Sequence, residues 1–145
     1  MTDTRLAQAR GRRLHPDAAA RISAKLTPPK PWLDLLQNYP IVGIEVSLSE
    51  DDDESGMGAE MRIMDDTEVL SEAFETYPGL VAVPMGYVPF AICLEGSGDP
   101  YFIRSSDGAV VRIPHDAVDE DELDESSIEL IARSLDNLFE KAALD

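Results

Sequence analysis

Cysteine, histidine and tryptophan are scarce in this sequence of 145 residues, which contains one, two and one of them respectively. The single cysteine, Cys93, has no second cysteine with which to form an intramolecular disulfide. A disulfide-stapled secreted scaffold is therefore excluded, and a reducing compartment is expected. Because its neighbours Ile92 and Leu94 are apolar, we interpret Cys93 as a buried strand residue and not as a reactive thiol.

Long apolar runs are also missing from the sequence. No stretch approaches the ~18 consecutive apolar residues that a membrane-spanning helix requires. No apolar run follows Arg12 and Arg13, so neither a secretory nor a twin-arginine signal is expected. The sequence therefore predicts a cytoplasmic protein with no membrane partner.

Basic residues are few: 12 Lys and Arg stand against 29 Asp and Glu, which gives a net charge of −17. This surplus of negative charge argues against nucleic acid as a ligand. Residues 1–30 hold seven basic and two acidic side chains, a net charge of +5, which leaves −22 on residues 31–145. We predict a basic N-terminal helical arm, residues 1–30, and a single α+β domain, residues 31–145. The arm either folds back on the acidic body or is a separate solvated segment.

The beginning of the chain predicts two helices and a strand. Residues 17–26 favour a helix, which a proline-rich connector ends. Trp32 then begins an apolar turn of helix, in which it is expected to anchor the core. From residue 44 onward, apolar side chains alternate with polar ones, as in a strand with one solvated face.

A run of acidic residues, 50–54, follows this strand, and we expect it to be a solvated loop that does not pack. Residues 61–64 predict a second strand. Asp65 or Asp66 then offers an N-cap carboxylate for a helix of about ten residues through Tyr77. The apolar face of this helix is expected to consist of Val69, Leu70, Ala73 and Phe74.

Three consecutive strands with short turns are predicted at residues 87–94, 101–103 and 110–113, which together form an antiparallel meander. Pro89 lies inside the first of them and removes a hydrogen-bond donor, so we expect a sheet edge or a bulge there. The glycine-rich turn at residues 96–99 runs into a strand and not into a helix. We therefore interpret it as a tight hairpin whose Asp99 binds local amides, and not as a phosphate-binding loop.

The last part of the chain allows two interpretations. Ser126 and Glu129 have the spacing of a capping box, which predicts one long helix over residues 127–144. Alternatively, residues 128–132 form a final strand and Ser134 caps a shorter helix. The hydrophobic periodicity does not decide between them.

Several of these segments together resemble the SUKH superfamily, which includes the fungal cell-wall synthesis regulators of the Smi/Knr type and many bacterial proteins. The resemblance rests on residues 86–91 (GYVPFA), 96–102 (GSGDPYF) and 132–139 (ARSLDNLF), and on the opening helix at residues 32–36 (WLDLL). It covers residues 30–143 in order. The acidic run at residues 50–54 and the basic arm have no counterpart in the family pattern.

The resemblance implies an α+β fold with a curved, mostly antiparallel sheet and helices packed mainly on one side. It also favours the strand followed by a helix at the end of the chain. Bacterial members of this family are interpreted as immunity proteins, which bind and neutralise polymorphic toxins that are often nucleases. The family thus implies a protein partner. We expect no cofactor and no catalytic residue.

The residues themselves give weak support to catalysis. The run that begins at Asp119 lacks the glycine of a calcium-binding loop, so a solvated acidic surface is the favoured interpretation over a metal site. His15 and His115 lie far apart in the sequence, and His115 with Asp116 is the one pairing that resembles an oriented base. No nucleophile lies in a recognisable motif.

The negative charge itself leads to the functional hypothesis. An acidic body accelerates its encounter with a basic protein, and nucleases carry basic surfaces for their substrates. We expect a non-catalytic module that binds a basic toxin domain; the alternatives are a regulatory scaffold for an endogenous partner and a metal-dependent hydrolase. The residues expected to contact the partner are Asp51, Asp52, Asp53, Glu54, Asp119, Glu120, Asp121 and Glu122.

Overall fold

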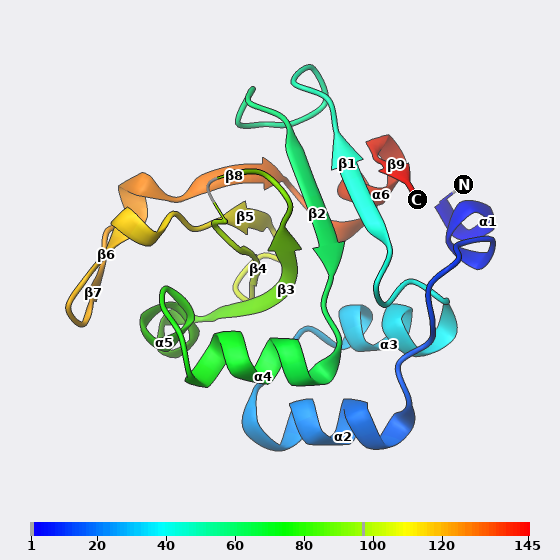
Figure 1. The fold of residues 1–145 in the computed structure, drawn as a ribbon, viewed down its shortest axis with the longest axis horizontal. Coiled ribbons are helices and arrows are strands. Elements are labelled where there is room, and N and C mark those ends of the chain that lie inside the picture. The colour runs from blue at the N-terminus through cyan, green and yellow to red at the C-terminus, as the bar shows by residue number, and fades with distance from the viewer. Residues whose placement is uncertain (1, 97) are drawn as a thin grey trace.

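A curled sheet with helices packed mainly against one face forms the framework of the computed structural model, which describes residues 2–96 and 98–145 (Figure 1). The helices are α1 (Thr2–Ala7), α2 (Pro16–Lys25), α3 (Lys30–Asn38), α4 (Asp66–Phe74), α5 (Gly79–Ala82) and α6 (Leu135–Lys141), with the short 3₁₀ helices η1 (Val83–Met85), η2 (His115–Ala117) and η3 (Glu125–Ser127). The strands are β1 (Glu45–Leu48), β2 (Ala59–Ile63), β3 (Tyr87–Cys93), β4 (Tyr101–Arg104), β5 (Val110–Arg112), β6 (Val118–Asp119), β7 (Glu122–Leu123), β8 (Glu129–Ala132) and β9 (Ala143–Leu144).

The main sheet has the strand order β8-β5-β4-β3-β2-β1-β9, and every neighbouring pair is antiparallel. Strands β3, β4 and β5 form the predicted meander. A separate hairpin consists of β6 and β7. The predicted α+β fold with a curved antiparallel sheet is confirmed.

The main core fills the space between one face of the sheet and helices α2, α3, α4 and α6. Alternation places Val46 of β1 and Met61 of β2 on this face, where both are fully buried. Trp32 of α3 meets Phe90 of β3 edge to face, with ring centroids 5.2 Å apart. Trp32 is therefore the core anchor that the sequence predicts.

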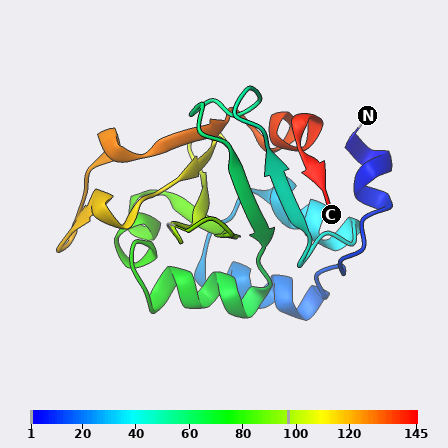
Figure 2. The same ribbon diagram turned by 45° about the horizontal axis from the view of Figure 1, so that its top comes forward.

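The opposite face of the sheet is covered along only part of its width. Over β4 and β5, Phe102 and Val111 pack with Ala82 of α5 and Ala117 of η2 in a second, smaller core. Over β1 and β2, the outward side chains Glu45 and Glu60 are exposed. We call the outward face of β1, β2 and β9 the open face, and Figure 2 shows these strands at the side of the sheet away from α5.

The N-terminal arm folds back on the body, which is the first of the two alternatives for its charge. Leu6, Leu14 and Ile22 are buried in the main core. Arg5 donates hydrogen bonds to the carbonyl oxygens of residues 139 and 142, at the end of α6. Two ion pairs join the arm to the start of α4: Arg12 to Asp65 at 3.2 Å and Arg21 to Asp66 at 3.0 Å.

Helix α4 begins as predicted, because Asp65 caps it and forms a reciprocal capping box with Glu68. The predicted end at Tyr77 is wrong, since α4 ends at Phe74 and α5 begins at Gly79. The placement of Phe74 on the apolar face is also wrong, because its side chain is 41% exposed. The chain turns here because glycine lets α5 approach α4: a Cβ at Gly79 would lie 1.8 Å from the backbone oxygen of Glu72.

Two open questions of the sequence are answered by the strands. Strand β3 lies inside the sheet, and its register with β4 shifts between Pro89 and Ala91, so Pro89 belongs to a bulge and not to an edge. The end of the chain is strand β8 followed by α6, because the Ser134 hydroxyl accepts a hydrogen bond from the backbone of Asn137 at 3.0 Å. The single long helix over residues 127–144 is not formed.

Replacing Ser134 with alanine should lower the free energy of unfolding by about 1 kcal/mol, because the amide at the start of α6 loses its side-chain acceptor. Urea denaturation monitored by circular dichroism measures the change. Ser23→Ala is the matched control, because Ser23 is exposed within α2 and alanine is a good helix former. Equal destabilisation of the two variants would contradict the capping role of Ser134.

Candidate functional site

The acidic residues predicted to contact a partner lie on two separate projections of the molecule. Residues 51–54 belong to the loop between β1 and β2, at the top of Figure 1, and residues 119–122 belong to the β6–β7 hairpin, at its left. The fold does not bring the two clusters together. A single composite site made from all eight carboxylates is therefore not formed.

The β1–β2 loop is more tightly packed than its sequence suggests. Asp53 is 5% exposed, and its carboxylate accepts hydrogen bonds from the Ser55 amide at 2.8 Å and from the Ser55 hydroxyl at 2.6 Å. Glu54 pairs with Arg133 at 2.9 Å, and its amide donates to the carbonyl oxygen of Ile131 in β8. The expectation of a fully solvated acidic loop is wrong for Asp53, because this residue closes the loop from within.

The β6–β7 hairpin, in contrast, presents its carboxylates to solvent. Asp119, Glu120, Asp121 and Glu122 are exposed, and none of the four has an ion pair within residues 2–96 and 98–145. The hairpin is anchored at its base by a hydrogen bond from the Asp124 amide to the Ala117 carbonyl oxygen, 2.7 Å long.

The sequence predicted the acidity of this segment but not its hairpin. The signal was present, because Val118 and Leu123 flank the four acids symmetrically and pair with each other across the two strands. Leu123 packs against the second core. Glu120 at the tip has a φ of 56°, in the left-handed region that favours glycine. Glycine would adopt this backbone conformation with less strain than glutamate does, yet the tip of the hairpin carries a carboxylate.

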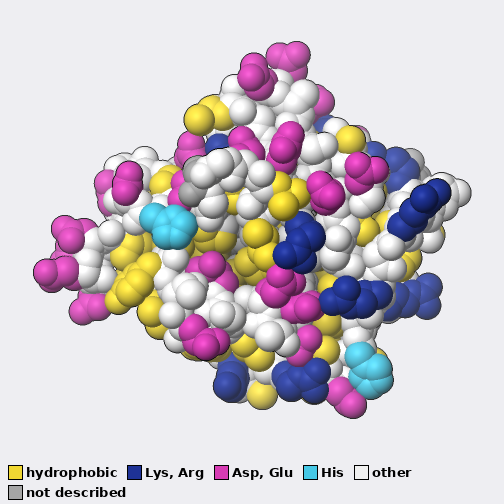
Figure 3. All heavy atoms as spheres, viewed as in Figure 1, with side chains coloured by type: hydrophobic (Ala, Val, Ile, Leu, Met, Phe, Trp, Pro, Cys, Tyr) yellow, Lys and Arg dark blue, Asp and Glu magenta, His cyan; other side chains and the backbone are white. Residues whose placement is uncertain are grey.

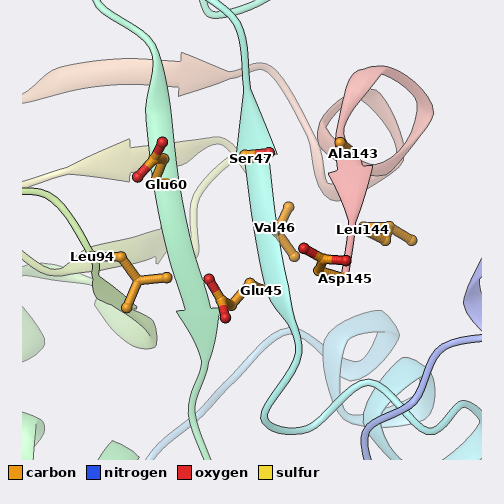
Figure 4. A pocket seen from close by; sticks show the side chains of 8 residues that line it. All are labelled: Glu45, Val46, Ser47, Glu60, Leu94, Ala143, Leu144 and Asp145. Carbon is orange, nitrogen blue, oxygen red and sulfur yellow. The ribbon is translucent and has the colours of Figure 1, made fainter.

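A hollow of about 280 Å³ on the open face is a second acidic feature, which sequence reasoning missed (Figure 4). Glu45 of β1, Glu60 of β2 and Asp145 line it together with Leu94, which is 40% exposed. None of the three carboxylates has an ion pair within the described part of the chain. Such a hollow can hold the cationic end of a lysine or arginine side chain.

A buried arginine links several segments of the main sheet. Arg112 of β5 is 4% exposed, yet its guanidinium donates to four acceptors from four other segments and lies 5.6 Å from the centre of the Tyr101 ring. It donates to Glu129 at 2.7 Å, to the Tyr101 hydroxyl at 3.0 Å, to Glu95 at 3.1 Å and to the carbonyl oxygen of Gly58 at 3.3 Å.

Burial alone would lower the pKa of Arg112, but its hydrogen bonds to Glu129 and Tyr101 outweigh this effect and raise the pKa. For the Tyr101 hydroxyl, burial has the opposite effect and raises the pKa, because the charged form of tyrosine is the deprotonated one. Arg112 therefore stays charged and joins β5, β4 and β8 to the residue that precedes β2. No sequence pattern identified this role, because Arg112 stands in an ordinary strand alternation.

The pairing of His115 with Asp116, which the sequence suggested, is not formed. His115 contacts Asp99 and not Asp116: its Nδ1 lies 2.5 Å from an Asp99 carboxylate oxygen, which also accepts from the His115 amide at 3.0 Å. Asp99 therefore reaches across to η2. The sequence had predicted only that Asp99 binds local amides. His15 caps α2 by accepting from the Asp17 amide. Of the predicted glycine-rich turn, Ser97 lies outside the described residues.

The His115–Asp99 pair joins the β3–β4 turn to η2 on the surface. Within residues 2–96 and 98–145, no three histidine, cysteine, aspartate or glutamate side chains lie close enough to hold a metal ion. Among the same residues, no helix is both long and apolar enough to cross a membrane. Buried Cys93 is a core residue of β3, as predicted.

Comparisons with known proteins leave the family undetermined, because no family model and no curated protein sequence matches the chain with significant similarity. The resemblance to the SUKH superfamily therefore remains a prediction from the quoted motifs.

Replacing Arg112 with leucine should lower the free energy of unfolding at neutral pH by about 2 kcal/mol or more, because Glu129 loses its charged donor and Glu95 keeps only the Tyr101 hydroxyl as a donor. Denaturant unfolding measures the loss. Arg133→Leu is the matched control, since Arg133 is 80% exposed and pairs with Glu54 at the surface, where an ion pair contributes less than about 1 kcal/mol. A loss no larger in R112L than in R133L would show that the contacts of Arg112 do not stabilise the sheet.

Proposed function

We propose that this chain is a non-catalytic protein-binding module of the immunity type, which neutralises a basic polymorphic toxin by binding to it. The observation that carries the proposal is the β6–β7 hairpin, whose four exposed carboxylates have no ion pair among the described residues. A nuclease is the favoured class of toxin, because a nuclease needs a basic surface to hold its nucleic acid.

The distribution of charge on the surface supports a basic partner. In Figure 3, Lys and Arg side chains gather at the right and bottom, over the N-terminal arm, while Asp and Glu side chains gather at the top and left. Part of the positive charge of the arm is neutralised within the molecule, because Arg12 and Arg21 form ion pairs at the start of α4. The hairpin therefore lies in a region where negative charge predominates.

This arrangement suggests how inhibition would work. Long-range attraction raises the rate of encounter with a basic protein by about 10- to 1,000-fold at low salt. Once docked, the hairpin carboxylates take the positions of the phosphates on the basic surface of the toxin. The inhibitor then excludes the nucleic acid from that surface and needs no reaction of its own.

The resemblance to the SUKH superfamily supports the same role, since its bacterial members are interpreted as immunity proteins. The curved antiparallel sheet is the fold that this resemblance implies. We place the binding in the cytoplasm, in keeping with the single buried cysteine, and the proposal involves no cofactor.

The proposal predicts that a toxin domain is encoded beside the gene for this chain, and it is tested with that domain. Wild-type protein should bind this domain, and the variant Glu120→Gln, Asp121→Asn, Glu122→Gln should associate about tenfold more slowly at low salt, with the difference fading at high salt. Stopped-flow or surface plasmon resonance kinetics at several salt concentrations measures the rates.

The control variant is Asp17→Asn, Asp136→Asn, Glu140→Gln, which removes the same net charge from exposed positions on helices. Its association rate should change by less than about twofold. Equal slowing by both variants would mean that net charge alone matters and would remove the hairpin from the proposal. A neighbourhood without a toxin gene, or wild-type protein that does not bind the encoded toxin domain, would overturn the proposed function.

A further inference from the structure

An exposed apolar surface lies between the end of α4 and the start of β3. Its members, which we call the α5 patch, come from a single stretch of chain and are each at least a third exposed: Phe74 41%, Tyr77 51%, Leu80 36% and Met85 54%. Large apolar side chains that gather on a surface often mark a site of protein contact. Neither the fold nor the proposed role of the hairpin explains why these four side chains are exposed.

The α5 patch adjoins the acidic hairpin. Helix α5 contacts β7 directly, and Leu123 of β7 packs in the second core with Ala82 of α5. Figure 1 shows α5 and the hairpin side by side, and in Figure 3 hydrophobic side chains gather next to the carboxylates at the left of the molecule. The hairpin thus lies beside the helix that carries Leu80.

The segment that carries the patch is held firmly in place. The Glu72 carboxylate accepts hydrogen bonds from the Thr76 hydroxyl at 3.0 Å and from the Gly79 amide at 3.3 Å, across the turn between α4 and α5. The turn packs around this side chain, and its burial raises the pKa of Glu72. A preformed surface loses little conformational entropy when a partner docks.

We propose that the α5 patch and the β6–β7 hairpin together form the docking surface for the basic toxin domain, with the patch supplying the apolar anchors and the hairpin the charged border. This inference rests on the proposed function and locates it on the molecule. The occupant is a basic surface that includes at least one exposed apolar side chain, because an apolar centre with a polar rim is how stable protein interfaces are built.

The charges around the patch fit this occupant. The hairpin contributes Asp119, Glu120, Asp121 and Glu122 on one side. On the other side the basic arm marks the limit of the patch, because the Lys25 ammonium lies 6.0 Å from the centre of the Phe74 ring. A basic partner would therefore be drawn toward the hairpin and repelled at α2, so the charges also fix its orientation.

The test measures the affinity of the toxin domain encoded beside the gene for Leu80→Glu, for Met85→Glu and for the control Met57→Glu. Met57 is 62% exposed on the β1–β2 loop, so the control makes the same substitution as Met85→Glu on the other projection. All three variants gain one negative charge, which favours a basic partner. A loss of affinity must therefore come from lost apolar contact and not from electrostatics.

We expect Leu80→Glu and Met85→Glu to weaken binding by about tenfold or more, mainly through faster dissociation, and Met57→Glu to change it by less than about twofold. Circular dichroism and thermal unfolding check that each variant is folded; Tyr77→Glu replaces Leu80→Glu if that variant is not. If the wild type binds but the patch variants are no weaker than the control, the docking surface is wrong and the proposed function stands. If the wild type does not bind, both are wrong.

Discussion

One buried guanidinium links segments from across the curled sheet. Arg112 binds Tyr101 on the neighbouring strand, carboxylates from two other segments and the backbone before β2, so it joins parts of the sheet that are not neighbours in strand order. Removing a charge from water is costly, and here several charge-assisted hydrogen bonds offset that cost. Because a guanidinium has a fixed planar shape, its partners must lie where its donors point. The guanidinium therefore constrains how β4, β8 and the residue before β2 lie around β5.

Local sequence signals predicted the elements of the fold well. The alternation around Val46, the capping carboxylate of Asp65 and the turns of the β3–β5 meander each depend on near neighbours in the chain, which is why they were visible. The partners of Arg112 and the place of the N-terminal arm depend on contacts between distant residues. Pro89 shows the limit of prediction from near neighbours. Because proline has no backbone N–H to donate, the sequence predicted an irregularity in the sheet, but only the strand order shows that it is a bulge and not an edge.

The candidate site shows why a count of charges describes a surface incompletely. Asp53 and Glu54 belong to the most acidic run of the loop, yet one is buried by the Ser55 contacts and the other pairs with Arg133. The hairpin carboxylates stay unpaired among the described residues because β6 and β7 project away from the body. The exposed apolar side chains of the α5 patch had no sequence signal, since Phe74 fits an amphipathic helix that ends one turn earlier than predicted.

The contacts between the arm and the end of the chain also set the order in which the protein can fold during synthesis. Leu6 shares the main core with Phe139, and Arg5 binds backbone oxygens at the end of α6. The arm is synthesised well before α6, because the backbone oxygens that Arg5 binds lie 134 and 137 residues later in the chain. Until then, its apolar side chains lack part of their core, and a nascent chain in this state exposes surface that chaperones recognise. Contacts between residues so far apart in sequence form slowly, and this slow step is the kinetic cost of a core that includes both Leu6 and Phe139.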